Sequence, residues 1–278
     1  MIDKINYFFI FFILILPITL IAGPAIPDIT ITLSVIFFLF STIINQSYKN
    51  IEHVIIDGNS TDQTWNIIKE NKFFPGKIIS EADSGANEAF NKALKFVTGE
   101  IVFFLLSDDF LANNNIIKKV VELFDSKTYI VYGNIEYFDH KKNKLTGRKF
   151  IPGEFKKNSY YKGWHAPFTA FFMKNICFEK YGNFKNTKQN HYRGYADDFE
   201  IMFRFQELNF LKSKYINETI TYMGTGGTSA KIINIIIGNY SVVKILSRHN
   251  KKIFAPIYLY KRLFPKILDK IKIFLKNI

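Results

Sequence analysis

The stretch DSGANEAFNKALKFVTGEIVFFLLSDD, residues 83–109, contains a turn, a helix and an apolar strand in succession. Its first three residues have the composition of a turn, and residues 87–97 have a helical periodicity that ends at a Thr-Gly pair. Residues 100–109 form an apolar run that is typical of a buried strand and that ends in two acids. This order predicts one unit of an α/β fold.

The same alternation continues on both sides of this unit. The further predicted elements are a strand at IEHVIID (51–57), a helix after GNSTD that Ser60 or Thr61 would cap, a strand at KIIS (77–80), a helix at NNNIIKKVVELF (113–124) and a strand at TYIVYGNIEYF (128–138). Strands that alternate with helices favour a mostly parallel sheet flanked by helices. Ligands of such a sheet bind at the carboxyl ends of its strands.

Acidic side chains fall at three of these strand ends. Asp57 closes one strand, Asp83 follows another, and Asp108 and Asp109 close a third. Any one of these acids alone is explained as a turn or helix-cap residue. Together they predict a site that binds a cation and a polar ligand.

The first 45 residues have the character of a membrane segment. Residues 7–22 and 29–44 carry no charge, and the GPAIPD turn separates them. Each run is slightly shorter than the roughly 20 residues of a usual spanning helix. Lys4 and Lys49 flank the pair, so the positive-inside rule predicts a hairpin with both ends in the cytoplasm. A signal peptide and a buried soluble helical hairpin are the alternatives.

The tail, residues 230–278, is strongly basic. Eleven Lys and Arg and a single acid, Asp269, give it +10 of the chain's net charge of +13. The basic residues alternate with apolar ones, which is typical of helices that lie on an anionic membrane. An ordinary amphipathic helix packed on the domain is the alternative. No recognised nucleic-acid motif accompanies the charge, so nucleic acid is not an expected partner.

The single cysteine, Cys177, excludes an internal disulfide and a zinc cluster built from cysteines. It is also in keeping with a reducing compartment.

Residues 41–229 resemble glycosyltransferase family 2, which has the GT-A fold, and within it the colanic-acid and O-antigen branch. The stretches that carry the resemblance are NQSYKNIEHVIIDGNSTDQT, SEADSGANEAFNKALKFVTGEIVFFLLSDDFL, YGNIEYF and YADDFEIMFR. Residues 14–40 more weakly resemble the start of O-antigen polymerase or ligase membrane proteins. The expected organisation is therefore an apolar hairpin (1–45), a catalytic domain (46–229) and a basic amphipathic helical tail (230–278).

The family resemblance implies a role for each acid. Asp57 would bind the nucleobase of a nucleotide-sugar donor, and Asp83 and Asp109 would belong to the same donor pocket. Asp108 would hold Mg²⁺ or Mn²⁺ on the donor diphosphate, where the ion needs only one or two carboxylates from the protein. Asp198 would be the catalytic base, although an acid in the first turn of a helix is also favoured by the helix dipole.

The resemblance further implies an inverting transfer at the cytoplasmic face of the membrane, in cell-surface polysaccharide synthesis. The donor would be a UDP-, GDP- or dTDP-sugar, and the acceptor a saccharide or a lipid-linked saccharide. Two departures from the family pattern favour an alternative, a catalytically impaired fusion or remnant with a structural or binding role. Leu106 replaces an Asp or Asn, and residues 24–32 lack the Tyr-Asn that ends the family's first strand.

Overall fold

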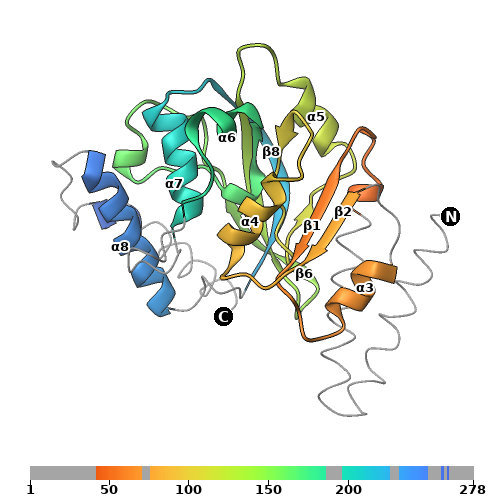
Figure 1. Ribbon diagram of the computed structural model, residues 1–278. Helices are drawn as coiled ribbons and strands as arrows, with labels where there is room; N and C mark the ends of the chain where they lie inside the picture. Colours follow the sequence, from red (N-terminus) through yellow and green to blue (C-terminus); the bar gives the residue numbers. More distant parts are fainter. Residues whose placement is uncertain are drawn as a thin grey trace.

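The computed structural model describes residues 42–70, 76–185, 196–225 and 232–249, together with three residues near the C-terminus, Tyr258, Leu259 and Arg262 (Figure 1). Its elements are, in chain order, β1 (His53–Asp57), α3 (Thr64–Glu70), β2 (Gly76–Ser80), α4 (Ala86–Leu94), β3 (Ile101–Val102), β4 (Phe110–Leu111), α5 (Ile116–Glu122), β5 (Ile130–Asp139), β6 (Lys144–Phe150), the 3₁₀ turns η1 (Tyr160–Lys162) and η2 (Phe168–Ala170), β7 (Phe171–Lys174), α6 (Ile176–Tyr181), α7 (Asp197–Phe203), the π-helix η4 (Arg204–Leu208), β8 (Ser213–Gly224) and α8 (Ile232–His249).

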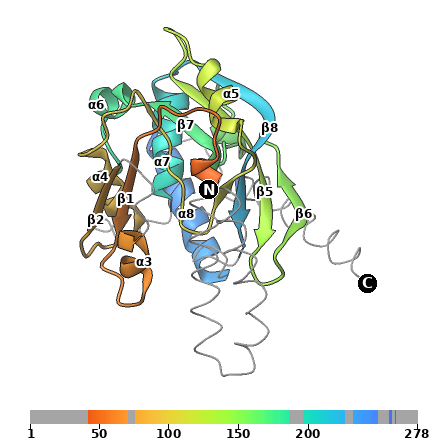
Figure 2. The same ribbon diagram turned by 90° about the vertical axis from the view of Figure 1, so that its right-hand side faces the viewer.

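The larger sheet has the strand order β3-β7-β5-β8-β4, with β6 paired to β5. Within it β5 and β8 are parallel, whereas the pairs β3–β7, β4–β8, β5–β6 and β5–β7 are antiparallel. Figure 2 shows β5, β6 and β8 side by side. The prediction of an α/β fold is confirmed, but a mostly parallel sheet is wrong for the described part of the chain. After β5 the chain turns back at residues 140–143, and such a short connection permits only antiparallel pairing.

The smaller sheet consists of β1 and β2, which pair in parallel with Asp57 opposite Ser80. The chain passes between them through α3, as the strand–helix–strand pattern predicts. The helix was predicted to be capped by Ser60 or Thr61. Instead, the Thr64 N–H at the start of α3 donates to Asp62 Oδ1 at 2.9 Å. Residues 24–32, where the family pattern places its first strand, lie outside the described residues.

The apolar run 100–109 forms less strand than predicted. Only Ile101 and Val102 pair with β7, and the chain then leaves the ladder and turns at residues 107–108. The turn is closed by the Asp109 N–H, which donates to the Leu106 carbonyl at 3.1 Å. The two acids therefore lie on the turn between β3 and β4. Hydrophobicity alone did not predict this departure, because Phe103 and Phe104 pack in the interior without being strand residues, for example through Phe103 stacked on Phe172 at 4.0 Å.

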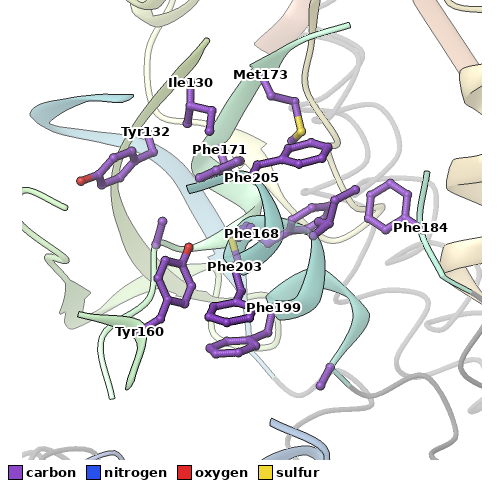
Figure 3. Close-up of a cluster of buried hydrophobic side chains, with 14 of the residues drawn as sticks. Ile130, Tyr132, Tyr160, Phe168, Phe171, Met173, Phe184, Phe199, Phe203 and Phe205 are labelled. Atoms are coloured by element: carbon purple, nitrogen blue, oxygen red, sulfur yellow. The ribbon is translucent and has the colours of Figure 1, made fainter. Parts of the chain in front are cut away.

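The larger sheet is covered on both faces, and its strands alternate between the two cores. Ile130 and Tyr132 of β5 belong to the core formed with α7, η4 and α8, whereas Val131 and Ile135 belong to the core that includes α5. Figure 3 shows the first of these cores, in which aromatic rings of β7, α7 and η4 lie beside β5. This two-residue period is that of a strand buried on both faces.

Helix α8 accounts for part of the predicted basic tail. Its residues Val242 and Leu246 are buried in the core against α7, so this part of the tail packs on the domain, which was the alternative reading. Ile236 and Tyr240 of the same helix are exposed. Within the described ranges, no helix combines the length and the apolar character needed to cross a membrane. The predicted apolar hairpin falls almost wholly on residues 1–41, which lie outside the described residues.

Candidate active site

Asp57 stands at the end of β1 and ties together the ends of both parallel strands. Its carboxylate accepts hydrogen bonds from the Ser60 hydroxyl at 2.5 Å, the Ser60 N–H at 3.1 Å and the Ser80 hydroxyl at 2.6 Å. Burial alone would raise the pKa of Asp57, but these hydrogen bonds to the charged form outweigh burial and lower the pKa. The side chain is therefore an ionised, fixed acceptor at the strand end that the sequence predicted.

Asp83 lies against the residue that follows Asp57. A Cβ atom placed on Gly58 would come within 2.9 Å of Asp83 Oδ2, so only glycine fits at this position without a shift. Asp83 Oδ1 accepts the Gly85 N–H at 2.8 Å, which shapes the turn before α4. The structure thus brings together Asp57 and Asp83, two of the residues expected to line one pocket.

The Asp108–Asp109 turn is positioned by two elements that are distant in the sequence. The Gly224 N–H at the end of β8 donates to Asp109 Oδ1 at 2.9 Å. A Cβ on Gly224 would lie 2.7 Å from both the carbonyl oxygen and Oδ2 of Asp108. His140, in the turn between β5 and β6, places Nε2 at 2.7 Å from the Asp108 carbonyl oxygen. Sequence reasoning found neither His140 nor Gly224 as a partner of this turn.

The two neighbouring acids have different surroundings. Asp108 is half-buried, whereas Asp109 is only 1% exposed, and its Oδ2 has no hydrogen-bond partner in the described part of the chain. Burial, with a smaller contribution from the Asp108 charge, raises the pKa of Asp109 to about 7, and the Gly224 N–H and the nearby Thr169 hydroxyl act in the opposite direction. Asp109 therefore holds a proton far more readily than an ordinary carboxyl group does.

These features fit a divalent cation that is shared with a bound diphosphate. Asp108 offers an accessible carboxylate that packs against Gly224, and the next residue, Asp109, has a buried carboxylate oxygen without a hydrogen-bond partner among the described residues. No group of three or more His, Cys, Asp or Glu side chains able to hold a metal occurs within the described ranges. One or two carboxylates with substrate phosphates are the usual ligands of Mg²⁺ in such sites.

Asp197 and Asp198 begin α7 and face different environments. Asp197 is 2% exposed and accepts a hydrogen bond from the Asn87 side chain in the first turn of α4. Asp198, the predicted base, is exposed, and its Oδ1 accepts the Phe199 N–H at 2.7 Å. Because α4 starts directly after the Asp83 turn, the Asn87 contact connects that turn with the start of α7. Of the two acids, Asp198 is the one that solvent or a substrate reaches.

A model of the family described as "Glycosyl transferase family 2" matches residues 35–184, more than half of the chain. The chain belongs to glycosyl transferase family 2. This confirms the predicted family. The matched residues include Asp57, Asp83, Asp108 and Asp109 and end before Asp198.

Two relatives from Escherichia coli are named for the same glucosyltransferase activity. The chain is 35% identical over 122 residues to "UDP-Glc:alpha-D-GlcNAc-diphosphoundecaprenol beta-1,3-glucosyltransferase WfaP", covering 43% of this chain and 47% of the relative. It is 27% identical over 123 residues to WfgD, which has the same activity in its name, covering 44% and 48%. The match thus spans about half the length of these relatives.

Solved structures of other transferases share the fold. A mannosyltransferase from Pyrobaculum calidifontis, in complex with GDP-Man and Mn²⁺, superposes with a TM-score of 0.57 at 16% identity, over 82% of this chain and 65% of that chain. TarS from S. aureus superposes with a TM-score of 0.58 at 18% identity, over 84% and 42%. At such identities the likeness shows the fold alone, and it confirms a GT-A-like α/β architecture.

In this family member the loop 151–165, which precedes η2, is fastened by side chains of the core. The Tyr132 hydroxyl donates to the Gly153 carbonyl at 3.0 Å and accepts the Phe155 N–H at 2.6 Å. Trp164 donates to the Pro152 carbonyl at 2.6 Å and packs edge-on against Tyr160 at 5.1 Å, so it has a packing role. The Tyr132 contacts join residues more than 20 positions apart, so no local pattern predicts them.

The segment after Asp198 is anchored by a buried ion pair. Glu200 accepts from Arg204 at 2.9 Å and from Lys185 at 2.7 Å. Arg204 also donates to the carbonyls of Tyr181, Gly182 and Asn183, the turn that follows α6. These contacts fix α7, and with it Asp198, to the body of the domain.

Proposed function

We propose that the chain is an inverting glycosyltransferase that moves a sugar from a nucleoside diphosphate sugar to a lipid-linked saccharide. The observation that carries this proposal is the Asp108–Asp109 turn, in which an accessible carboxylate packed against Gly224 is followed by a buried carboxylate with an oxygen that has no hydrogen-bond partner among the described residues. Membership of the family supports the reaction type. The lipid-linked acceptor is supported by the names of the two E. coli relatives.

In this proposal the donor lies across the ends of β1 and β2. Asp57 and Asp83 bind its base and ribose, and the Asp108–Asp109 turn faces its diphosphate. A bound Mg²⁺ or Mn²⁺ neutralises the charge that develops on the leaving diphosphate. The donor nucleotide is uridine, guanosine or thymidine diphosphate, and uridine is favoured by the names of the relatives.

Asp198 is the proposed base. It is exposed at the start of a helix that an ion pair and the Asn87 contact hold in place, so its carboxylate can take the proton from an acceptor hydroxyl as that hydroxyl attacks the anomeric carbon. The attack from the face opposite the leaving group inverts the configuration. A positioned base of this kind contributes on the order of 100- to 10,000-fold in rate.

The site of action is proposed to be the cytoplasmic face of the membrane. Support comes from the net charge of +10 carried by the tail beyond residue 230 and from the uncharged runs before residue 45. Both the anionic surface and the lipid-linked acceptor would then be within reach of the same domain.

Two substitutions test the catalytic assignments on the full chain. Asp108→Asn is expected to abolish the Mn²⁺-dependent part of UDP binding measured by calorimetry. Asp198→Asn is expected to retain that binding and to lose transfer of sugar from a panel of UDP-, GDP- and dTDP-sugars by about 100-fold or more. Glu122→Gln is the matched control, because Glu122 is a mostly exposed acid of α5 whose pair with Lys118 is 4.0 Å long.

The same measurements separate the enzyme from the impaired remnant that Leu106 and the start of the chain suggested. A remnant would bind no donor with Mn²⁺, or would bind it without turnover of any donor in the panel. Unchanged Mn²⁺-dependent UDP binding in Asp108→Asn would show that the cation is held elsewhere.

A further inference from the structure

The side chain of His140 contacts the main chain of the proposed cation-binding turn. The Nε2 atom of His140 lies 2.7 Å from the carbonyl oxygen of Asp108. A carbonyl oxygen can only accept a hydrogen bond, so Nε2 must carry the hydrogen. The ring is therefore in the Nε2–H tautomer when it is neutral, and it is a donor to the Asp108 main chain in either protonation state.

The His140 ring is itself held by aromatic neighbours. It lies 5.1 Å from the Phe138 ring and 6.4 Å from the Phe110 ring, both in edge-on arrangements. The Phe138 carbonyl accepts the Thr225 N–H at 2.9 Å, so the end of β8 is fastened to the same end of β5. The imidazole thus follows directly on the end of β5 that β8 also holds.

Gly224 limits the other side of the turn. Its missing side chain leaves room for the Asp108 carbonyl and carboxylate, each 2.7 Å from where a Cβ would stand. Its N–H fixes the Asp109 carboxylate at 2.9 Å. The Asp108 main chain is consequently held by a donor from the β5–β6 turn, while its carboxylate occupies a space that the end of β8 leaves open.

We infer that His140 is a positioning residue of the cation site: its hydrogen bond to the Asp108 carbonyl orients the Asp108 carboxylate toward the ion. This inference rests on the proposed function, in which Asp108 holds the cation. Residues that orient metal ligands typically change metal affinity by about 10- to 100-fold when they are replaced. His140 acts without touching the ion or the substrate.

Three variants of the full chain isolate the hydrogen bond from the packing of the ring. H140F keeps an aromatic ring against Phe110 and Phe138 but has no donor, H140A loses both, and H140Q places an amide N–H near the position of Nε2. The quantity measured by calorimetry is the gain in UDP affinity that Mn²⁺ produces, taken as the ratio of the Kd in EDTA to the Kd in Mn²⁺. We expect H140F and H140A to lose about 10-fold or more of that gain, H140Q to recover most of it, and the Kd in EDTA to stay unchanged.

A second readout tests the contact without any ligand. The ¹⁵N shifts of the His140 ring are expected to report the Nε2–H tautomer at neutral pH in the wild-type chain. An Nδ1–H tautomer overturns the inference even if the chain is an active transferase. If H140F keeps the full Mn²⁺-dependent gain in UDP affinity of the wild type, the inference is also overturned. If the wild type shows no Mn²⁺-dependent gain at all, the proposed cation site fails, and the ring shifts still report separately whether His140 holds the turn.

Discussion

Replacing Asp109 by asparagine should change how the stability of the chain depends on pH. The carboxyl group is 1% exposed, and its pKa rises from 3.8 to about 7 on folding. Asparagine keeps an oxygen that can accept the Gly224 N–H, but it does not ionise. Any constant cost of placing an amide at this position is the same at every pH, so the pH-dependent part of the difference between the two proteins belongs to Asp109.

The sign follows from proton binding. The folded state holds the Asp109 proton more tightly than the unfolded state does, so the contribution of this proton to stability is fully present below about pH 3.8 and is lost as the pH rises through about 7. At about 1.4 kcal/mol per pH unit, the total loss is on the order of 4 kcal/mol. About 3 kcal/mol of it falls between pH 4.5 and pH 8.

Urea unfolding followed by far-UV circular dichroism at several pH values measures this difference. We expect the free energy of unfolding of the wild type, relative to D109N, to fall by about 3 kcal/mol from pH 4.5 to pH 8. D108N should reduce that fall, because the Asp108 charge contributes to the raised pKa of Asp109. Stability curves for the wild type and D109N that run parallel over the whole range would show that the pKa of Asp109 is not raised on folding.

Three further outcomes are expected. Arg204→Met should lower the free energy of unfolding by about 3–5 kcal/mol, measured in urea, because it leaves the buried Glu200 carboxylate without its main partner; an effect below about 1 kcal/mol would contradict this. Asn87→Ala should lower kcat more than it raises KM for the donor, since the lost contact is to Asp197 beside the proposed base, and equal effects on both constants would argue against a positioning role. The chain should co-sediment with anionic vesicles at low salt and be released at high salt because of the positive charge on residues 231–278. Binding that depends on neither lipid charge nor ionic strength would show that the basic residues do not drive it.

The local elements of this fold were predictable because they depend on short-range patterns. The helix predicted at 113–124 is α5 (Ile116–Glu122), and the strand predicted at 128–138 is β5 (Ile130–Asp139). Strand direction was not predictable in the same way. Buried strands have the same apolar pattern in parallel and antiparallel sheets, so the antiparallel partners of β5 had no signal in the periodicity.

The candidate site likewise combines features that a local pattern predicts with contacts between residues distant in the sequence. The rule that ligands bind at strand ends predicts Asp57 and Asp83 as site residues, and the structure places Asp83 against Gly58, the residue after Asp57. The partners of the acidic turn could not be found from sequence, because the His140 contact spans 32 positions and the Gly224 contact 115. The turn residues around His140 have no local pattern that marks them as neighbours of Asp108. The family resemblance implies that the glycine-rich residues 223–229 lie near the donor and acceptor, but it does not place Gly224 against Asp108 in particular.

The structure also indicates how Leu106 affects the acidic turn and the affinity for a donor. The side chain at this position is apolar where relatives were expected to have Asp or Asn, but the main chain of Leu106 still closes the turn by accepting the Asp109 N–H at 3.1 Å. His140 and Gly224 hold the same turn from outside. The geometry of the two acids therefore does not depend on a polar side chain at 106. What the substitution removes is one hydrogen bond to a ligand, worth about 1–3 kcal/mol, or about 5- to 150-fold in donor affinity. A loss of that size would weaken donor binding without displacing the proposed cation site or the proposed base, so Leu106 alone argues for a transferase with a high KM rather than for an inactive remnant.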